Sequence, residues 1–184
     1  MKSMKKYIGM FLVLFVFSCS DSKTEQIELT KANEVKVGFS PEGTALSVVL
    51  NTIDSAKVSI NMMGYSFTSP TIVKHLINAK KRGVVIKIVL DHKGNKGKSS
   101  IAAMNLIQQA GISLRTDDAY AIQHDKVIIA DDETVQTGSF NYSYAADKRN
   151  SENVISIKHK GLAKAYNEHF LDRWSKGKDY DLSY

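Results

Sequence analysis

The chain has 184 residues, a size typical of one compact domain. Its 43% hydrophobic and 24% charged residues are ordinary globular values, so they exclude a chain that is disordered throughout. The single cysteine excludes an intrachain disulfide and a zinc site built on several cysteines. Residues 1–18 hold three of the positive charges and no acids, so the rest of the chain carries 6 − 3 = +3. Binding of a polyanion would therefore depend on a local cluster of cations.

The first residues have the pattern of an export signal. Three lysines precede an apolar run, residues 7–17, which as a helix would span about 16 Å, roughly half of a bilayer core. Val16 stands three places before Cys19 and Ser18 directly before it, an arrangement that resembles the lipobox of bacterial lipoproteins. We therefore expect residues 1–18 to be a signal peptide and Cys19 to be lipidated. The alternative is ordinary cleavage near Ser18 that leaves a free thiol.

Residues 19–33 are polar and mixed in charge, and they predict a tether between a membrane and the domain. A short helix around residues 26–31 is the alternative for this stretch. The domain itself is expected to span residues 34–184. Together these features predict an exported protein, anchored to a membrane and facing the periplasm or the cell surface.

Within the domain, stretches with strand periodicity alternate with stretches of helical periodicity. The expected elements, in order, are a strand at 34–38, a helix that begins at Ser40-Pro41 and runs to 53, a strand at 57–62, a helix from Pro70 that ends at Arg82-Gly83, a strand at 84–90, a helix at 101–110, strands at 112–114, 127–130 and 154–157, and a helix at 162–174. This alternation predicts a single α/β domain with a mixed, mostly parallel sheet flanked by helices. No internal repeat is visible.

One stretch carries polar residue types at a spacing that chance does not explain. It reads H-x-K-x4-D-x6-G-S-x-N, and a carboxylate follows it. Six fixed types match at random about once in 10⁸ start positions. The residues are His124, Lys126, Asp131, Gly138, Ser139 and Asn141, followed by Glu152.

These residue types suit the handling of an anionic centre. His124 and Lys126 are two apart, so on a strand their side chains would share one face. An imidazole can act as nucleophile or as general acid and base, and a lysine beside it supplies positive charge. Ser139 and Asn141 offer neutral hydrogen-bonding groups, and Glu152 could accept the second imidazole N–H. A phosphate diester is the substrate that this set of groups fits best.

Each part of the pattern also has a plain structural interpretation. A lone histidine on a strand is usually a hydrogen-bonded structural residue, and Gly-Ser-x-Asn is common in turns. Asp131 could open a hairpin turn together with Asp132, and we favour a structural role for it. Only the joint pattern outweighs these interpretations.

The pattern resembles the signature of the phospholipase D superfamily. Further short stretches are similar to the short bacterial Nuc-type endonuclease branch of that family, and the likeness extends over about residues 34–175. These stretches are Phe39-Ser-Pro41, Ala56, residues 64–69, Ala79, residues 82–84, Asp91, Gly111-Ile112, residues 137–143, Ala146, Asn150 and Glu152-Asn153.

The resemblance implies a role for each residue of the pattern. It implies that His124 is a nucleophile that forms a phosphohistidine, and that Lys126, Ser139 and Asn141 hold the phosphate. It implies that Glu152 orients the histidine, and it leaves the role of Asp131 less certain. It also implies a mechanism that needs no metal or other cofactor.

The family mechanism uses two such motifs, one histidine attacking while the other protonates the leaving oxygen. This chain has one motif. The resemblance therefore implies a homodimer with both motifs at the interface, a coupled pair of histidines and a bell-shaped dependence of rate on pH.

The substrate is less well determined than the reaction. A nuclease is favoured, because Lys93, Lys96 and Lys98 lie in the loop after a buried strand and could follow a nucleic-acid backbone. The alternative for this loop is a solvated, flexible segment. Tyr65 and Phe67 could stack on bases or could belong to the core. A phospholipase or phosphatidyl-transfer enzyme is the second hypothesis, and a non-catalytic nucleic-acid-binding surface protein is the third.

Overall fold

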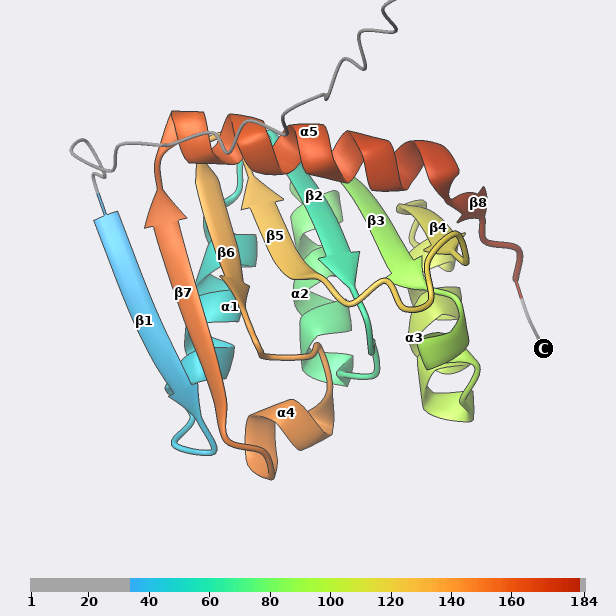
Figure 1. The fold of residues 1–184 in the computed structure, drawn as a ribbon, viewed down its shortest axis with the longest axis horizontal. Helices are drawn as coiled ribbons and strands as arrows, with labels where there is room; N and C mark the ends of the chain where they lie inside the picture. The colour runs from blue at the N-terminus through green and yellow to red at the C-terminus, as the bar shows by residue number, and fades with distance from the viewer. Residues whose placement is uncertain (1–33, 183–184) are drawn as a thin grey trace, which may run out of the picture.

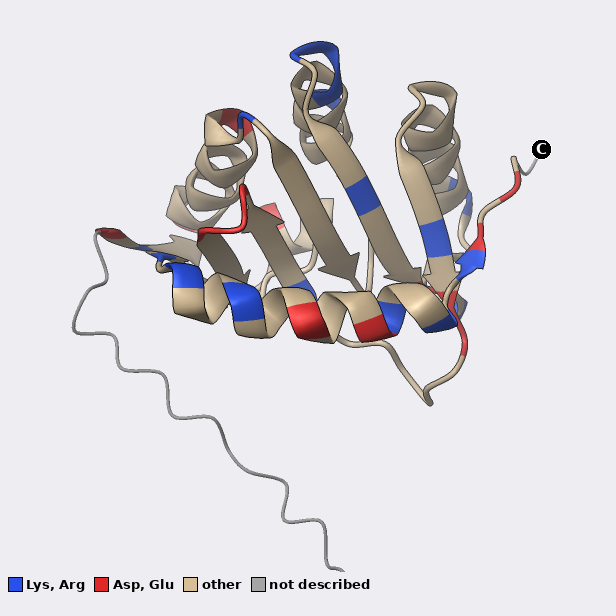
Figure 2. Cartoon of the chain, turned by 90° about the horizontal axis from the view of Figure 1, so that it is seen from above, with Lys and Arg blue, Asp and Glu red and all other residues tan. Residues whose placement is uncertain are grey.

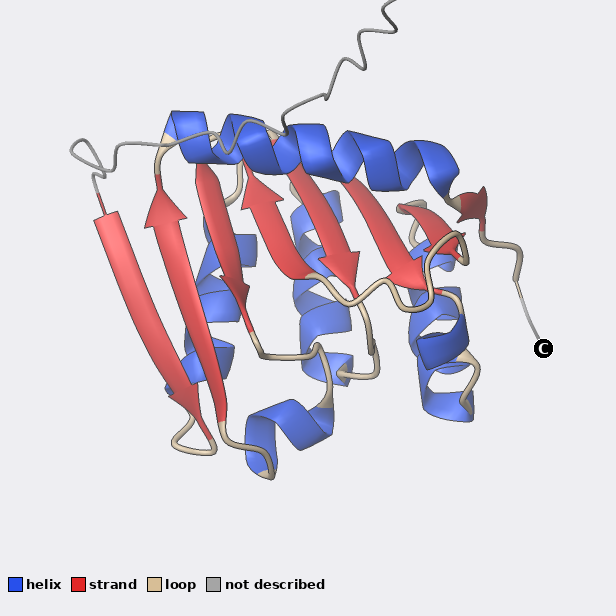
Figure 3. Ribbon diagram, in the orientation of Figure 1, coloured by secondary structure: helices blue, strands red, loops and turns tan. Residues whose placement is uncertain are grey.

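Eight strands form one mixed sheet in the computed structural model, which describes residues 34–182. The sheet order is β1-β7-β6-β5-β2-β3-β4-β8 (Figures 1 and 3). The strands are β1 (Glu34–Ser40), β2 (Ser59–Gly64), β3 (Val85–Asp91), β4 (Ser113–Asp117), β5 (Lys126–Ala130), β6 (Thr134–Gly138), β7 (Glu152–Lys158) and β8 (Lys178–Asp179). The helices are α1 (Thr44–Ser55), α2 (Pro70–Lys81), α3 (Lys98–Gln109), α4 (Tyr144–Lys148) and α5 (Lys160–Lys176), with a 3₁₀ turn η2 (Lys93–Asn95).

The prediction of an α/β domain with a mixed sheet is confirmed, but the expected excess of parallel pairs is wrong. Only β2–β3 and β3–β4 pair in parallel, and the other neighbours in the sheet run antiparallel. For the β5–β6 pair the reason is the connection after β5, where a tight turn at Asp131 and Asp132 leads directly into β6. Without a crossover helix the chain can only return as a hairpin. The short, polar β6 strand was missing from the predicted elements.

The helices cover both faces of the sheet. α1, α2 and α3 pack on one face, and α5 crosses the other face alone (Figure 1). The larger apolar cluster lies under the three helices, and a smaller one under α5 is built around Phe170, Met63 and Val89. Charged side chains follow the length of α5 in blocks, with lysines at its start, acids in its middle and basic residues at its end (Figure 2), as expected of a solvated helix.

The bounds of α2 follow from local sequence, whereas α3 begins three residues earlier than predicted and α4 was not predicted. The Ser69 hydroxyl accepts the N–H of Ile72 at the start of α2, and Gly83 follows the helix at φ 95°. The first helix begins at Thr44 instead of Ser40-Pro41. Ser40 is the buried last residue of β1, and its hydroxyl donates to the carbonyl of Ala146 at 2.6 Å, so it cannot cap the helix.

The predicted signal peptide, the lipidated Cys19 and the tether lie outside the described residues. Within residues 34–182, no helix is long and apolar enough to cross a membrane.

Candidate active site

One end of the sheet gathers most of the residues that the sequence singled out. The strand register pairs Gly64 with Lys126, Gly138 with Val154 and Ser40 with Glu152, so the ends of β2, β6 and β1 meet the starts of β5 and β7. The helix α4 and the loop before β5 lie at this same end (Figure 1).

His124 lies in the loop before β5, because that strand begins at Lys126; its predicted place on the strand is therefore wrong. Its ring contacts the ring of Tyr65 edge-on, with the centroids 4.8 Å apart. The Lys126 ammonium lies 5.5 Å from the centre of the same Tyr65 ring and donates to the carbonyl oxygen of His124 at 2.7 Å. The histidine and the lysine are thus held close together by a turn of the backbone and one shared aromatic ring.

Lys126 is a buried cation, with 6% of the residue exposed. Burial lowers its pKa, and the nearby carboxylates of Asp125 and Glu152 oppose that effect without cancelling it. The His124 carbonyl is its one hydrogen-bond acceptor among the described residues, whereas an ammonium has three donors. The remaining donors are available to an anionic ligand.

Ser139 and Glu152 lie at the same end of the sheet and bond to each other. The Ser139 hydroxyl donates to Glu152 Oε2 at 2.5 Å and accepts the backbone N–H of Asn153 at 3.1 Å. Asn150 Nδ2 donates to the other Glu152 oxygen at 2.9 Å. Both carboxylate oxygens are therefore bonded, and no hydrogen bond joins Glu152 to the His124 ring within residues 34–182. The orienting role of Glu152 stays a prediction.

Gly138 and Asn141 complete the motif. Gly138 has φ 152°, and a Cβ there would lie 2.2 Å from the backbone oxygen of Asn153, so only glycine fits. The Asn141 side chain is half-buried, and its Oδ1 has no hydrogen-bond partner in the described part of the chain. An unpartnered amide oxygen is uncommon in a folded domain. As an acceptor it needs a donor, so the Asn141 side chain can offer a phosphate only the two donors of its Nδ2.

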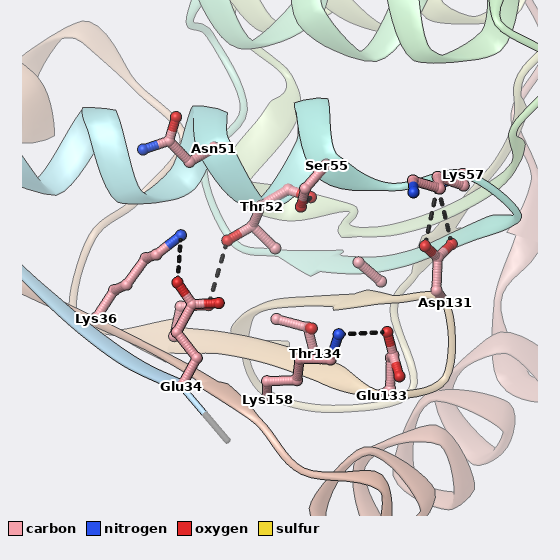
Figure 4. Close-up of a pocket in the computed structure, with 12 residues that line it drawn as sticks. Glu34, Lys36, Asn51, Thr52, Ser55, Lys57, Asp131, Glu133, Thr134 and Lys158 are labelled. Carbon is pink, nitrogen blue, oxygen red and sulfur yellow. Dashed lines mark hydrogen bonds and ion pairs between the residues drawn. The ribbon is translucent and has the colours of Figure 1, made fainter. Parts of the chain in front are cut away.

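Asp131 lies at the opposite end of the sheet from the other motif residues. Its carboxylate accepts backbone N–H groups from Lys57 at 2.9 Å, Val58 at 2.8 Å and Ser59 at 2.9 Å. The five steps of extended chain from Lys126 to Asp131 place them about 16 Å apart. Asp131 lines a polar pocket of about 280 Å³ at that far end (Figure 4). These contacts agree with the structural role that we favour for Asp131, and a catalytic role for this motif residue stays a prediction without support from its position.

The far-end pocket is itself a set of paired charges. Lys36 bonds Glu34 and Lys158 bonds Glu133, each at 3.0 Å (Figure 4). Its lysines and acids thus largely satisfy one another.

The predicted substrate-contacting residues divide into two groups. Phe67 is fully buried and pairs with Tyr142 in an isolated parallel bridge, so its expected base-stacking role is wrong and it belongs to the core. Tyr65 is half-buried against His124 and lies at the site. The three lysines that follow β3 are all exposed, but only Lys96 lies outside helical structure. Lys93 begins η2 and donates to the carbonyl of Ala121 at 3.5 Å, and Lys98 is the first residue of α3, so its predicted place in the loop is wrong.

Sequence reasoning missed some of the residues that support the site. Asn95 is 2% exposed and bonds the backbone of Tyr65 and Phe67, yet it stood unmarked in a glycine- and lysine-rich loop. Asn150 and Asn153 were noted only as part of a resemblance, although their places beside Glu152 were a usable signal. Among the described residues, no group of three or more His, Cys, Asp or Glu side chains is arranged to hold a metal ion.

An α/β domain that gathers a histidine, a buried lysine, a serine and an asparagine at one sheet end defines a class of proteins that act on phosphate esters. Comparison with known proteins identifies the family. Residues 49–174 match the family model "Cardiolipin synthase, PLD-like domain". The chain belongs to the phospholipase D superfamily, and it is a phosphodiesterase of that type.

Two relatives similar to this chain are named for activities on lipids. The chain is 41% identical over 146 residues to a phospholipase D of Rickettsia conorii, covering 79% of this chain and 72% of the relative. It is 30% identical over 132 residues to the mitochondrial cardiolipin hydrolase of Danio rerio, covering 71% of this chain and 57% of the relative.

A solved structure is closer in sequence. The phospholipase D family member Nuc from Salmonella typhimurium has a TM-score of 0.79 and 58% identity, covering 80% of this chain and 97% of that chain.

Proposed function

We propose that the protein is an exported endonuclease that cleaves DNA, or RNA, without a metal ion. The observation that carries the proposal is the set of phosphate-binding groups around His124, in a chain 58% identical to Nuc over 80% of its length. The exposed lysines that follow β3 support a nucleic-acid substrate, because they lie at the end of the sheet that holds the site.

The proposed reaction has two displacements at phosphorus. A ring nitrogen of His124 attacks the phosphodiester, and the bond from phosphorus to the leaving oxygen breaks while a second imidazole gives that oxygen a proton. Water then attacks the phosphohistidine, the second imidazole takes a proton from the water, and His124 leaves with the electrons of the P–N bond. Lys126 and the Asn141 amide donors stabilise the charge on the phosphoryl oxygens in both steps. Ser139 joins them when its hydroxyl proton turns from Glu152 to the phosphate.

The second imidazole is His124 of another copy of the chain, because the sequence holds one motif. An exposed apolar strip on the edge strand β1 supports this homodimer. Val35, Val37 and Phe39 are each more than half exposed, lie on one face of the strand, and lead to the site, where Phe39 pairs with Asn153. We propose that a second copy covers this strip and brings its own half-site.

The first experiment incubates residues 20–184 with single- and double-stranded DNA and RNA in excess EDTA. The wild type is expected to cleave at least one of these substrates, and His124→Ala is expected to be inactive. A folded, dimeric wild type that cleaves none of them would contradict the nuclease proposal.

A mixing experiment tests the composite site. In an equal mixture of freely exchanging wild-type and His124→Ala chains, about one quarter of dimers hold two histidines. The expected rate is thus about one quarter of that of wild type alone at the same total concentration. A rate of about one half would show that each chain works by itself.

The paired mechanism also predicts a bell-shaped dependence of the cleavage rate on pH, and a flat rate profile would contradict it.

A phospholipase D activity is the second candidate, favoured by the names of the Rickettsia and Danio relatives. Ile122, 52% exposed in the loop before His124, also offers apolar surface beside the site. Vesicles of phosphatidylethanolamine and cardiolipin, assayed for released phosphatidic acid with the same two proteins, separate this activity from nuclease activity.

For the location of the protein, we propose export followed by lipidation of Cys19. The support is the amino-terminal sequence alone. Metabolic labelling with a palmitate analogue, compared between the full-length protein and Cys19→Ala, is expected to label only the first. Equal labelling would contradict the anchor.

A further inference from the structure

Two buried polar side chains connect the segments that surround His124, and neither belongs to the motif. Asp91 is the last residue of β3 and is 1% exposed; Asn95 ends η2 and is 2% exposed. Both lie at the same end of the sheet as the site. They contact main-chain groups, so they form part of its framework.

The Asp91 carboxylate holds the backbone next to the histidine. Its Oδ2 accepts the N–H of Gln123 at 2.8 Å, and its Oδ1 accepts the N–H of Gly94 at 2.5 Å. Gln123 precedes His124 and is 2% exposed, so its N–H would lack a partner without this carboxylate. Hydrogen bonds to a carboxylate are roughly twice as strong as neutral ones. One side chain therefore joins β3, the lysine-bearing loop and the histidine segment.

Asn95 holds the other side of His124. Its Nδ2 donates to the carbonyl of Tyr65 at 2.6 Å and to that of Asp91 at 2.8 Å, while its Oδ1 accepts the N–H of Phe67 at 2.9 Å. The ring of Tyr65 is the one that contacts His124. A Cβ on Gly94 would lie 2.9 Å from that ring, so the loop backbone also packs tightly against it.

We propose that Asp91 and Asn95 are positioning residues: they hold the backbone of Gln123 and the ring of Tyr65 as one unit, and so fix the ring of His124 for attack on phosphorus. The inference rests on the proposed role of His124 as the reacting group. Neither side chain touches the substrate in this account. Their effect is on the rate of the bound complex, because a displacement of about 1 Å at a reacting group can cost about a hundredfold.

The test compares Asp91→Asn and Asn95→Ala with Asp117→Asn as matched control. Asp117 ends the neighbouring strand, is the register partner of Asp91 and is equally buried, but its carboxylate accepts the N–H of Ala119 in its own turn. Each variant is assayed with bis(4-nitrophenyl) phosphate for kcat and KM. The ring signals of His124, assigned from the signals missing in His124→Ala, are recorded by NMR.

Asp91→Asn and Asn95→Ala are expected to lower kcat at least tenfold, to leave KM within about threefold, and to shift the His124 ring signals. Asp117→Asn is expected to keep both kcat and the ring signals of wild type. Equal kcat in the Asp91 and Asp117 variants, or a loss confined to KM, would overturn the proposal. So would unfolding of both test variants while the control folds, since the residues would then serve folding alone.

Failure of the proposed function and failure of the positioning role give different experimental results. If wild type hydrolyses no phosphodiester, the proposed function is wrong, and the ring signals still report whether Asp91 and Asn95 place His124. If wild type is active and the ring signals do not move in either variant, the positioning role is wrong and the proposed function stands.

Discussion

Replacing Asp131 with alanine should lower stability and leave catalysis intact. The substitution removes hydrogen bonds to three backbone N–H groups, of which those of Lys57 and Val58 are exposed and that of Ser59 is partly buried. At about 0.5–1 kcal/mol for each exposed bond and about 1.5 kcal/mol for the third, the loss is about 3 kcal/mol. Asp131 also has φ 55°, a conformation that aspartate tolerates better than alanine.

In a domain of this size, 3 kcal/mol corresponds to a fall in Tm of roughly 10 °C. The assay pairs thermal unfolding by circular dichroism with hydrolysis of bis(4-nitrophenyl) phosphate at a temperature where every variant is folded. kcat/KM is expected to stay within about twofold of wild type, because Asp131 lies about 16 Å from Lys126 along the strand. Asp132→Ala is the control: its exposed side chain accepts one hydrogen bond, from Asn167, so it should cost about 1 kcal/mol or less.

The same carboxylate gives a pH signature. Burial alone would raise the pKa of Asp131, but hydrogen bonds from the Ser59, Lys57 and Val58 backbone outweigh it, and the pKa lies below its ordinary value. A lowered pKa stabilises the fold above the unfolded-state pKa of about 3.9, and this stabilisation is lost as pH falls through the folded-state pKa. The stability gap between wild type and Asp131→Asn should therefore be full at neutral pH and shrink below about pH 4. A tenfold loss of activity in folded Asp131→Ala, with an unchanged Tm, would contradict the structural role of Asp131.

Three further substitutions separate the site from its supports. Gly138→Ala should destabilise the protein by more than about 3 kcal/mol in chemical unfolding, since its Cβ would lie 2.2 Å from a backbone oxygen of β7; a stable variant would contradict the close packing. Phe67→Ala should cost about 3–5 kcal/mol and leave KM for DNA unchanged in the folded protein, whereas a base-stacking role predicts the reverse. Replacing Lys93, Lys96 and Lys98 with glutamine should weaken DNA binding. The slope of the logarithm of the binding constant against the logarithm of salt concentration should become shallower by about 0.9 per lost phosphate contact, and an unchanged slope would show that these lysines contact no phosphate.

The motif could be predicted because its residue types and spacing are rare in combination. The distance between Asp131 and the rest of the motif could also be predicted from the sequence. The five-residue strand that begins at Lys126 ends directly before Asp131, so the two side chains cannot contact the same phosphate. The lysine, by contrast, curls back onto the carbonyl of His124. A two-residue spacing implies a shared face only on a strand, and His124 precedes one.

Other parts of the structure depend on contacts between distant residues, which spacing does not encode. Asn95 meets Tyr65 across 30 positions of sequence, and Ser40 meets Ala146 across 106. The antiparallel β5–β6 pair follows from the turn at Asp131 and Asp132, both at positive φ, and from a β6 strand too polar to predict. Tertiary pairing, rather than local preference, decides such elements.

Three features without a partner in the described part of the chain lie at the site end of the sheet or lead to it. Lys126 has donors to spare, Asn141 has an unpartnered oxygen, and the apolar strip of β1 ends at Phe39 beside the site. At the far end, by contrast, Asp131 is fully engaged by backbone and the pocket charges pair with each other. An anionic substrate would accept hydrogen bonds from the spare donors of Lys126. The Asn141 oxygen is an acceptor and needs a donor instead, and the proposed second copy would cover the apolar strip. The unpartnered polar groups of the site lie next to the exposed apolar strip of β1. A substitution at Val37 that blocks dimer formation should therefore abolish activity together with association, although Val37 itself contacts no substrate in the proposed dimer.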